Sequence, residues 1–454
     1  MPVITPLLQR HGGTWLASTF TPEDQEVARS APAGSDQGGY SLRLLDIPSD
    51  MHREHYEVLS VGYLGYLFHR LFHLAHAPVF TARLAAAWES YRQVNRIYAS
   101  AVQEVRDATV VLVEDHHLMF VGEELRRGRS GFDLPLAYFH HVPWCEPEYF
   151  DIQPPEVRDR ILRGLLAYDV VGFHSSRWAR AFVACCDRFL PEAECDDGRV
   201  QWRGRPAHVV VAPAPVDVAA LIDATRSPGM EAWSARLEER RAGRRAIVRV
   251  DRADLWKNVL RGFAAFEEML CGSPDLVDSV CFLAILAPTR MWLPDYRRYL
   301  RDCAASARSI NERYASRALP GTMPVEMVIG NGDHHRALAA MRLADVLLVN
   351  PIADGLNVVA KEGPIVSDRD GVLVLSRTAG AYEELHQGAI GINPFDVLDT
   401  ADAMSRGINM DPHERSRRAA SLRSTITSTT PETWMRARLA PVLGSPAENG
   451  TSRR

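Results

Sequence analysis

Short runs of apolar, often β-branched residues recur along the first half of this chain and alternate with segments of helical periodicity. They lie at 109–113, 135–139, 170–173 and 209–212. A continuous apolar run of this length is typical of a strand that is buried on both faces of a parallel sheet. Because helical segments separate the runs, the pattern predicts a doubly wound α/β sheet.

A second series of such runs follows, at 246–250, 280–286, 325–329, 345–349 and 372–375. Prolines 213 and 215 and the polar stretch around 227–229 lie between the two series and indicate a linker. A chain of 454 residues suits two or three domains. We therefore predict two Rossmann-like domains, 1–225 and 226–428, then a helix over 429–443 and a disordered polar tail over 444–454.

Composition excludes several classes of protein. The net charge of −5 gives no electrostatic footprint for nucleic acid or an anionic membrane. No apolar run reaches the ~18 residues of a membrane span, and the N-terminus shows no signal peptide. The seven cysteines form no Cys-x-x-Cys pair, which fits reduced thiols in a cytoplasmic protein.

The stretch 347–363 combines a strand, a tight glycine loop and the start of a helix. Asn350-Pro351 ends the strand, Asp354-Gly355 forms the loop, and a helix follows from Asn357. This order brings unpaired backbone N–H groups and the positive end of the helix dipole to one point, which suits a phosphate or a sugar hydroxyl. Taken alone, the pattern is also that of an ordinary strand-to-helix turn.

Four motifs in order carry a resemblance to a known family. They are Glu-Asp-His-His-Leu at 114–118, His-His-Val-Pro-Trp at 140–144, Val-Asp-Arg-Ala-Asp-Leu-Trp-Lys at 250–257, and Asp-Gly-Leu-Asn-Val-Val-Ala-Lys-Glu at 354–362. Together they resemble the trehalose-6-phosphate synthase family of retaining glycosyltransferases, over about residues 8–434. The resemblance implies a GT-B fold, in which two Rossmann-like domains face across a cleft and a C-terminal helix crosses back to the first domain.

The donor side can be assigned in these terms. Arg252 and Lys257 follow the strand 246–250, and fixed cations there can neutralise a diphosphate leaving group. The single Asp-x-Asp triplet, Asp368-Arg369-Asp370, precedes the predicted strand 372–375 instead of following a strand, and we expect neither a metal nor a cofactor. The resemblance implies that Glu362 accepts the two ribose hydroxyls of the donor. It also implies that the donor is bound by the loop residues Asp354, Gly355, Leu356, Asn357 and Val358.

Asp115 and His141 each follow a predicted strand, so they should face a common crevice. The resemblance implies that Asp115 contacts the sugars and that His141 lies near the anomeric carbon. Neither need be a nucleophile, because retention in the family is attributed to front-face attack, with a donor phosphate oxygen accepting the proton. Neighbouring His140 is predicted to be structural, since side chains alternate along a strand.

The acceptor side departs from the family pattern. Tyr56 and Arg290 match the positions that hold the acceptor's phosphate, but Gly65 replaces a family tryptophan, and Asn258 replaces the glycine after the lysine. The family's opening strand and glycine pair are also missing before residue 4. We expect that the true start lies upstream and restores that first strand; a degenerate relative is the alternative.

The predicted activity is transfer of glucose from UDP-glucose or GDP-glucose to a phosphorylated sugar or polyol, with retention. Two alternatives stay open: a pseudoglycosyltransferase that joins cyclitols through nitrogen, and a non-catalytic nucleotide-sugar binder. We expect no nucleic-acid or membrane partner, and a homo-oligomer is possible. His69, His73 and His76 fall at i, i+4 and i+7 of one predicted helix, a spacing that could bind zinc. No fourth ligand is evident, and we expect no metal there.

Overall fold

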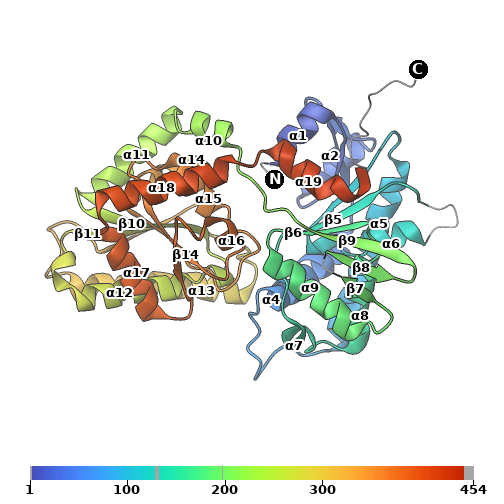
Figure 1. The fold of residues 1–454 in the computed structure, drawn as a ribbon, viewed down its shortest axis with the longest axis horizontal. Coiled ribbons are helices and arrows are strands. Elements are labelled where there is room, and N and C mark those ends of the chain that lie inside the picture. Colours follow the sequence, from blue (N-terminus) through green and yellow to red (C-terminus); the bar gives the residue numbers. More distant parts are fainter. Residues whose placement is uncertain (1–2, 128–131, 197, 444–454) are drawn as a thin grey trace, which may run out of the picture. The chain divides into compact units, whose positions relative to one another are not determined.

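The computed structural model describes residues 3–127, 132–196 and 198–443. It divides into two compact units (Figure 1): unit 1 holds Met1–Ala214 and Pro431–Arg454, and unit 2 holds Pro215–Thr430. The first unit ends at Ala214 rather than at the predicted residue 225, because helix α10 (Val218–Ala224) packs on helix α15 (Val359–Val366) of unit 2. None of the helices in the described residues combines the length and apolar character that a membrane span requires.

The sheet of unit 2 has six parallel strands in the order β12-β11-β10-β13-β14-β15. The chain order reverses between β10 and β13, which is the position where open α/β sheets bind ligands. Five of the six strands match the predicted apolar runs, and the short β15 was missed. The strands are β10 (Arg245–Arg252), β11 (Val280–Ala287), β12 (Val325–Ile329), β13 (Val346–Val349), β14 (Val372–Ser376) and β15 (Ile390–Ile392).

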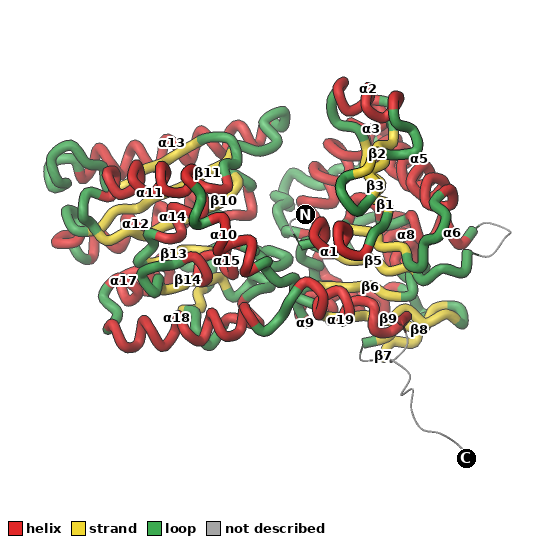
Figure 2. Tube along the Cα trace, turned by 90° about the horizontal axis from the view of Figure 1, so that it is seen from above, coloured by secondary structure: helices red, strands yellow, loops and turns green. Residues whose placement is uncertain are grey.

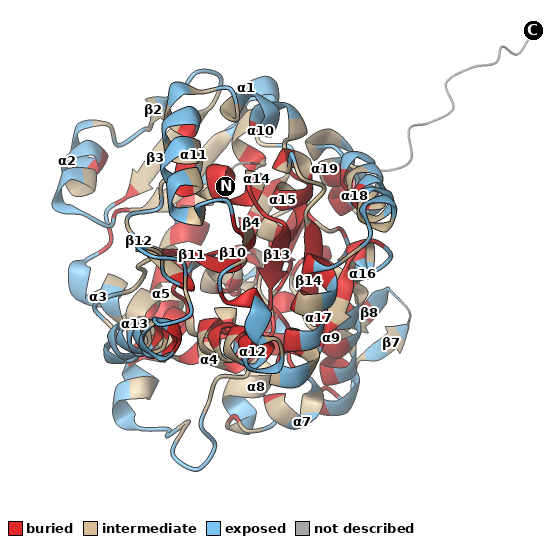
Figure 3. Ribbon diagram, turned by 90° about the vertical axis from the view of Figure 1, so that its left-hand side faces the viewer, coloured by how far each residue is buried: buried red, intermediate tan, exposed pale blue. Residues whose placement is uncertain are grey.

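Helices cover both faces of this sheet, and its central strands are buried (Figure 3). On one face, Phe263 and Phe266 of α12 pack edge-on against Phe282 of β11, with ring centroids 5.4 and 5.3 Å apart. Burial of such rings is a large favourable term in folding. The helices, besides α10 and α15, are α11 (Pro228–Arg241), α12 (Val259–Gly272), α13 (Pro294–Tyr314), α14 (His334–Arg342), α16 (Tyr382–Leu385), α17 (Val397–Ile408) and α18 (Pro412–Thr427).

Unit 1 has a six-stranded sheet in the order β4-β5-β6-β9-β8-β7. The predicted strands β4 (Val111–Glu114), β5 (Leu136–His140), β6 (Val170–Phe173) and β9 (Arg205–Val211) are parallel, and β8 (Arg199–Trp202) and β7 (Glu194–Asp196) extend the sheet antiparallel. This extension was not predicted from the sequence. Its turn, Arg203-Gly204, has two positive φ angles, which suit a tight hairpin.

The N-terminal part of unit 1 forms a separate sheet of three strands. In it β1 (Thr14–Ser18) runs parallel to β3 (Ser41–Leu45), and β2 (Ser35–Asp36) pairs antiparallel with β3. The remaining helices of unit 1, apart from residues 49–68 and the C-terminal helix, are α1 (Ile4–His11), α2 (Pro22–Ser30), α5 (Ala82–Glu104), α6 (Val121–Arg126), α7 (Pro147–Phe150), α8 (Pro155–Leu165) and α9 (Ser176–Phe189).

The helix predicted over 54–72 is shorter and wider than expected. After α3 (Ser49–Arg53), the residues Glu54–Leu64 form a π-helix, and α4 (Gly65–Phe68) ends the segment. The extra residue per turn is visible in the bond from Gly65 N–H to Ser60 O. Because α4 ends before residue 69, His69, His73 and His76 do not lie on one face of a helix, so the spacing assumed for a zinc site is wrong. His69 is buried, and its Nδ1 lies 2.8 Å from Gly65 O.

Helix α19 (Pro431–Leu443) runs beside β6 and β9 of unit 1 (Figure 2). Leu439 packs with Ala137 and Val170, and the indole of Trp434 donates a 2.8 Å hydrogen bond to Ala212 O. These contacts fix α19 against the sheet. The tail predicted to be disordered, 444–454, lies outside the described residues.

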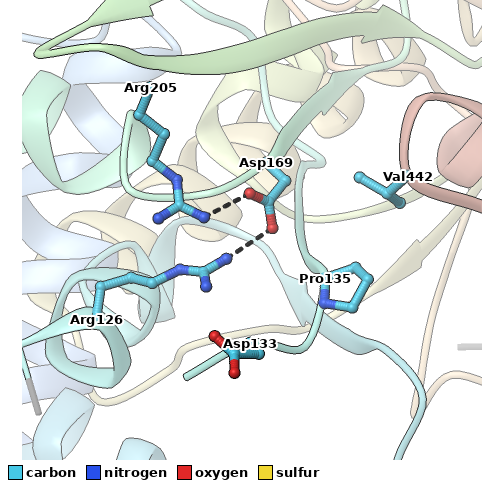
Figure 4. Close-up of a pocket in the computed structure, with 6 residues that line it drawn as sticks. All are labelled: Arg126, Asp133, Pro135, Asp169, Arg205 and Val442. Carbon is cyan, nitrogen blue, oxygen red and sulfur yellow. Dashed lines mark hydrogen bonds and ion pairs between the residues drawn. The ribbon is translucent and has the colours of Figure 1, made fainter. Parts of the chain in front are cut away.

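A pocket of about 410 Å³ lies at the amino ends of the unit 1 strands (Figure 4). Asp169, directly before β6, accepts hydrogen bonds of 2.7 Å from both Arg126 and Arg205. Two arginines therefore pair with the Asp169 carboxylate at this edge of the sheet. Because the predicted site residues follow the strands, they lie at the opposite, carboxyl ends.

Candidate active site

The predicted residues fall into two groups at the carboxyl ends of the two sheets. Tyr56, Asp115 and His141 belong to unit 1. The unit 2 group follows β10, β11 and β13 and extends into α15; it comprises Arg252, Lys257, Arg290, Asp354, Gly355, Leu356, Asn357, Val358 and Glu362.

The loop between β13 and α15 is held by the segment after β14. Asp354 N–H donates to Thr378 O at 3.2 Å, and Ala381 N–H donates to Leu356 O at 2.9 Å. A β carbon on Gly380 would lie only 1.9 Å from Gly355 O, so the two backbones meet closely because Gly380 has no side chain. The loop is therefore fixed in shape without a ligand.

Backbone donors converge at the start of α15. The N–H groups of Leu356, Asn357 and Val358 have no acceptor among the described residues, although Leu356 and Asn357 are buried. Asn357 has a φ of 78°, and this left-handed conformation turns the chain into the helix. Open N–H groups at a helix start suit an anion or sugar hydroxyls.

Lys257 reaches this loop from the end of β10. Its ammonium lies 2.7 Å from Asp354 Oδ2 and 3.7 Å from Asp251 Oδ1, and its side chain is 13% exposed. Burial by itself lowers the pKa of Lys257, but the two carboxylates outweigh burial and raise it. The site therefore holds a permanent positive charge at the switch point of the sheet.

Asn258 explains how the chain replaces the family's glycine. Its φ is 60°, in the left-handed region that asparagine tolerates better than most residues. The side-chain amide donates to Asn350 O at 3.0 Å and to Pro394 O at 2.8 Å. The backbone conformation that glycine would allow is thus kept, and the side chain ties together the loops after β13 and β15.

Asp254 pairs with both arginines of the unit 2 group. Its fully buried carboxylate accepts from Arg252 Nε at 2.9 Å and forms a close ion pair with Arg290. The Arg290 guanidinium also lies over the rings of Trp256 and Tyr296. Two cations on one carboxylate leave one net positive charge beside Lys257.

Glu362 lies on the first turn of α15. No hydrogen bond or ion pair joins its carboxylate to another described residue. Burial raises the pKa of Glu362 to about 7. A half-buried carboxylate with no protein partner is suited to accept hydroxyl groups of a ligand.

In unit 1, Asp115 connects the ends of β4 and β5. Its Oδ1 accepts from the backbone N–H groups of His116 and His141, at 2.9 and 3.2 Å. Burial raises the pKa of Asp115, but the adjacent His116 and its hydrogen bonds outweigh this and hold the pKa well below its ordinary value. Its φ of 70° marks a strained turn, as is common at functional sites.

His141 is held at both ring nitrogens. Nε2 lies 2.6 Å from Glu114 Oε2, and Nδ1 lies 3.1 Å from His174 Nε2. The other Glu114 oxygen accepts a 2.7 Å bond from Arg438 of α19. Burial raises the pKa of Glu114, but Arg438 and the bond from His141 outweigh it and lower the pKa to about 2.

Glu114, His174 and Arg438 also belong to the site, and the sequence did not predict them. Glu114 stood inside a quoted motif without a role, and no pattern links it to a helix 324 residues further on. His140, in contrast, is structural as predicted: it is fully buried, and burial lowers its pKa to about 3.

The π-helix places Tyr56 in a stack of rings. His52 and His117 lie on either side, with centroids 5.7 and 5.5 Å away, and Phe20 meets Tyr56 edge-on at 5.3 Å. Phe20 is 61% exposed. This aromatic surface, also missed in the sequence, extends from Phe20 to the residues beside Asp115 and suits the apolar face of a sugar ring.

One group of ligand-type atoms lies close enough to hold a metal ion among the described residues. Asp115, His116 and His117 place such atoms within 4.8 Å of one another. Both His116 nitrogens are already engaged, with Asp115 Oδ1 at 3.0 Å and Ser60 O at 3.1 Å. The group is therefore a hydrogen-bonded turn in this structure.

Comparison with known proteins decides the family, because residues 1–442 match the model of glycosyltransferase family 20. The chain belongs to glycosyltransferase family 20. A relative from Arabidopsis thaliana, α,α-trehalose-phosphate synthase [UDP-forming] 1, is 31% identical over 364 residues. That alignment covers 79% of this chain but 38% of the plant protein, so the chain spans well under half of that relative.

Two further proteins are similar over most of their length. Validamine 7-phosphate valienyltransferase from Streptomyces hygroscopicus subsp. jinggangensis is 29% identical, over 80% of this chain and 71% of that protein. An α,α-trehalose-phosphate synthase (UDP-forming) from Burkholderia vietnamiensis superposes with a TM-score of 0.84 at 28% identity, over 95% of each chain. The family resemblance and the α/β fold of GT-B type predicted from the sequence are confirmed.

Proposed function

We propose that this protein is a retaining glucosyltransferase that transfers glucose from UDP-glucose or GDP-glucose to a sugar phosphate. The observation that carries the proposal is the fixed positive charge of Lys257 beside the open N–H groups of residues 356–358. Together they suit a diphosphate at the switch point of the unit 2 sheet.

Four side chains of unit 2 take defined tasks in this proposal. Lys257 and Arg252 stabilise the negative charge that develops on the departing diphosphate. Glu362, which has no protein partner in the described residues, accepts the ribose hydroxyls. Asp354 accepts hydroxyls of the transferred glucose once Lys257 turns to the phosphates.

The proton of the acceptor hydroxyl goes to a phosphate oxygen of the leaving group, so attack and departure share one face and configuration is retained. The low pKa of Asp115 supports this assignment, because a carboxylate that is hard to protonate is a poor general base. Asp115 instead accepts sugar hydroxyls, and His141 borders the anomeric centre.

Within unit 2 we assign the binding of a phosphate group to Arg290, and within unit 1 we assign the stacking of a sugar ring to the aromatic surface around Tyr56. The Arg290 guanidinium pairs with Asp254, and its planar set of N–H donors suits the oxygens of a phosphate. The protein is proposed to work in the cytosol without a metal. Its seven cysteines are all free, as a reducing compartment requires.

The experiment that tests the proposal is a thermal-shift screen with UDP-glucose, GDP-glucose and the free nucleosides. A ligand at 100 times its dissociation constant stabilises the folded state by about 2.7 kcal/mol. We expect one nucleoside-diphosphate glucose to raise the unfolding midpoint and uridine or guanosine to leave it unchanged. No shift with either nucleotide sugar would contradict the proposed donor.

A further inference from the structure

A line of hydrogen bonds in unit 1 runs from the main chain to His141. Ala214 N–H donates to His174 Nδ1 at 3.3 Å. Because Nδ1 of His174 accepts this bond, the proton of the neutral ring lies on Nε2. That Nε2 lies 3.1 Å from His141 Nδ1 and therefore donates to it.

The line continues in one direction through His141. Since Nδ1 of His141 accepts, its ring proton lies on Nε2, which faces Glu114 Oε2 at 2.6 Å. Glu114 Oε1 in turn accepts from Arg438 Nη2 at 2.7 Å. Each N–H named in this line meets an acceptor, and the charges of Glu114 and Arg438 cancel, while Arg438 Nη1 has no hydrogen-bond partner among the described residues.

Arg438 is placed so that it needs Glu114. The residue is 1% exposed, and its guanidinium lies 4.4 Å from the ring centroid of Phe139 and 4.6 Å from that of Trp434. A buried cation without a counter-ion is strongly destabilising. Glu114 is its ion-pair partner, so helix α19 and the end of β4 are joined through one carboxylate.

We propose that Glu114 and Arg438 are positioning residues that fix which nitrogen of His141 carries the proton and hold its ring beside the transferring sugar. This inference deepens the proposed function and rests on it for the link to catalysis. Because both ring nitrogens are engaged within the protein, His141 does not take the acceptor's proton.

The variant Glu114→Gln tests this directly. Arg438 can only donate, so the glutamine oxygen must face Arg438 and its NH₂ group must face His141 Nε2. His141 Nε2 then accepts a hydrogen bond, so the ring proton of His141 must lie on Nδ1, where it faces the Nε2–H group of His174. We expect nitrogen-15 NMR of histidine-labelled protein to show an Nε2–H tautomer in the wild type and an Nδ1–H tautomer in Glu114→Gln.

The kinetic expectation is specific as well. Displacement of the His141 ring in Glu114→Gln should lower kcat by about 10- to 100-fold. The KM of the donor should be nearly unchanged, because the proposed donor contacts in unit 2 are intact. Adding Arg438→Met frees the glutamine to turn its oxygen to His141. The double variant should therefore regain the Nε2–H tautomer and most of kcat, and it carries no unpaired buried charge that would prevent folding.

Asp169→Asn is the matched control. It removes a carboxylate that pairs with two arginines in the same sheet, at the amino ends of the strands. It should lower stability but leave the His141 tautomer and kcat at wild-type values. An Nε2–H tautomer in Glu114→Gln, or no recovery of that tautomer in the double variant, overturns the inference, as does an unchanged kcat in an active enzyme. If the wild type transfers no glucose, the proposed function fails, and the tautomers alone decide the inference.

Discussion

Replacing Lys257 by methionine removes one positive charge but keeps most of the buried side chain, so the change isolates electrostatics from packing. In the free protein, the ammonium is 2.7 Å from Asp354, and the two side chains are 13% and 14% exposed. Breaking a buried pair by removing one partner typically costs about 3–5 kcal/mol. In a domain of this size, that loss lowers the unfolding midpoint by about 6–20 °C.

The effect on catalysis should exceed what the loss of stability explains. Loss of one preorganised group that faces developing charge lowers turnover by about 10²-fold or more. The companion variant Lys257→Met/Asp354→Asn removes both charges of the pair. It should recover most of the stability, because no unpaired carboxylate is left, but its turnover should stay low.

Two measurements separate these effects: the thermal midpoint by calorimetry, and the release of UDP or GDP in a coupled assay well below the midpoint. If Lys257→Met turns over at a near-wild-type rate with any donor that the protein uses, the diphosphate assignment is wrong. If the double variant recovers turnover together with stability, Lys257 serves only the fold.

Three other predictions follow from the site. Glu362→Gln should weaken UDP binding by about 1–2 kcal/mol in titration calorimetry, and an unchanged dissociation constant excludes the ribose role. Because burial raises the pKa of Glu362 to about 7, the affinity of the wild type for UDP should also fall as the pH drops below about 7, while that of the variant should not change over this range. Asn258→Ala should lower the unfolding midpoint more than Asn258→Gly. Both variants lose the hydrogen bonds to Asn350 O and Pro394 O, but only alanine is strained in the left-handed conformation, by about 1–2 kcal/mol. Equal midpoints for the two variants would contradict this. EDTA should leave the midpoint and the activity unchanged, and a drop would reveal a metal, for which the turn 115–117 is the site to examine.

Most parallel strands of the two six-stranded sheets could be predicted because they are largely apolar runs, but the three-residue β15 was missed. The same runs located Asp115, His141, Lys257 and the loop after β13, since residues that follow parallel strands share one edge of a sheet. The hairpin of β7 and β8 was missed because its strands are short and mostly polar, so they resemble a loop.

Features that depend on distant contacts could not be predicted in this way. The pair Glu114–Arg438 joins residues 324 positions apart, and a buried arginine in a helix carries no local pattern. The π-helix over Glu54–Leu64 keeps an apolar composition like that of an α-helix. Its wider turn is accompanied by a local 2.8 Å hydrogen bond from Ser60 Oγ to His55 O, which the apolar spacing does not reveal.

The most direct test of the account is proton and phosphorus NMR of the purified chain with UDP-glucose or GDP-glucose and glucose 6-phosphate. The account predicts release of the nucleoside diphosphate together with a new phosphorylated disaccharide, whose transferred glucose keeps the α-configuration of the donor. Binding of the nucleotide sugar with no transfer to glucose 6-phosphate or to any other sugar phosphate would contradict it.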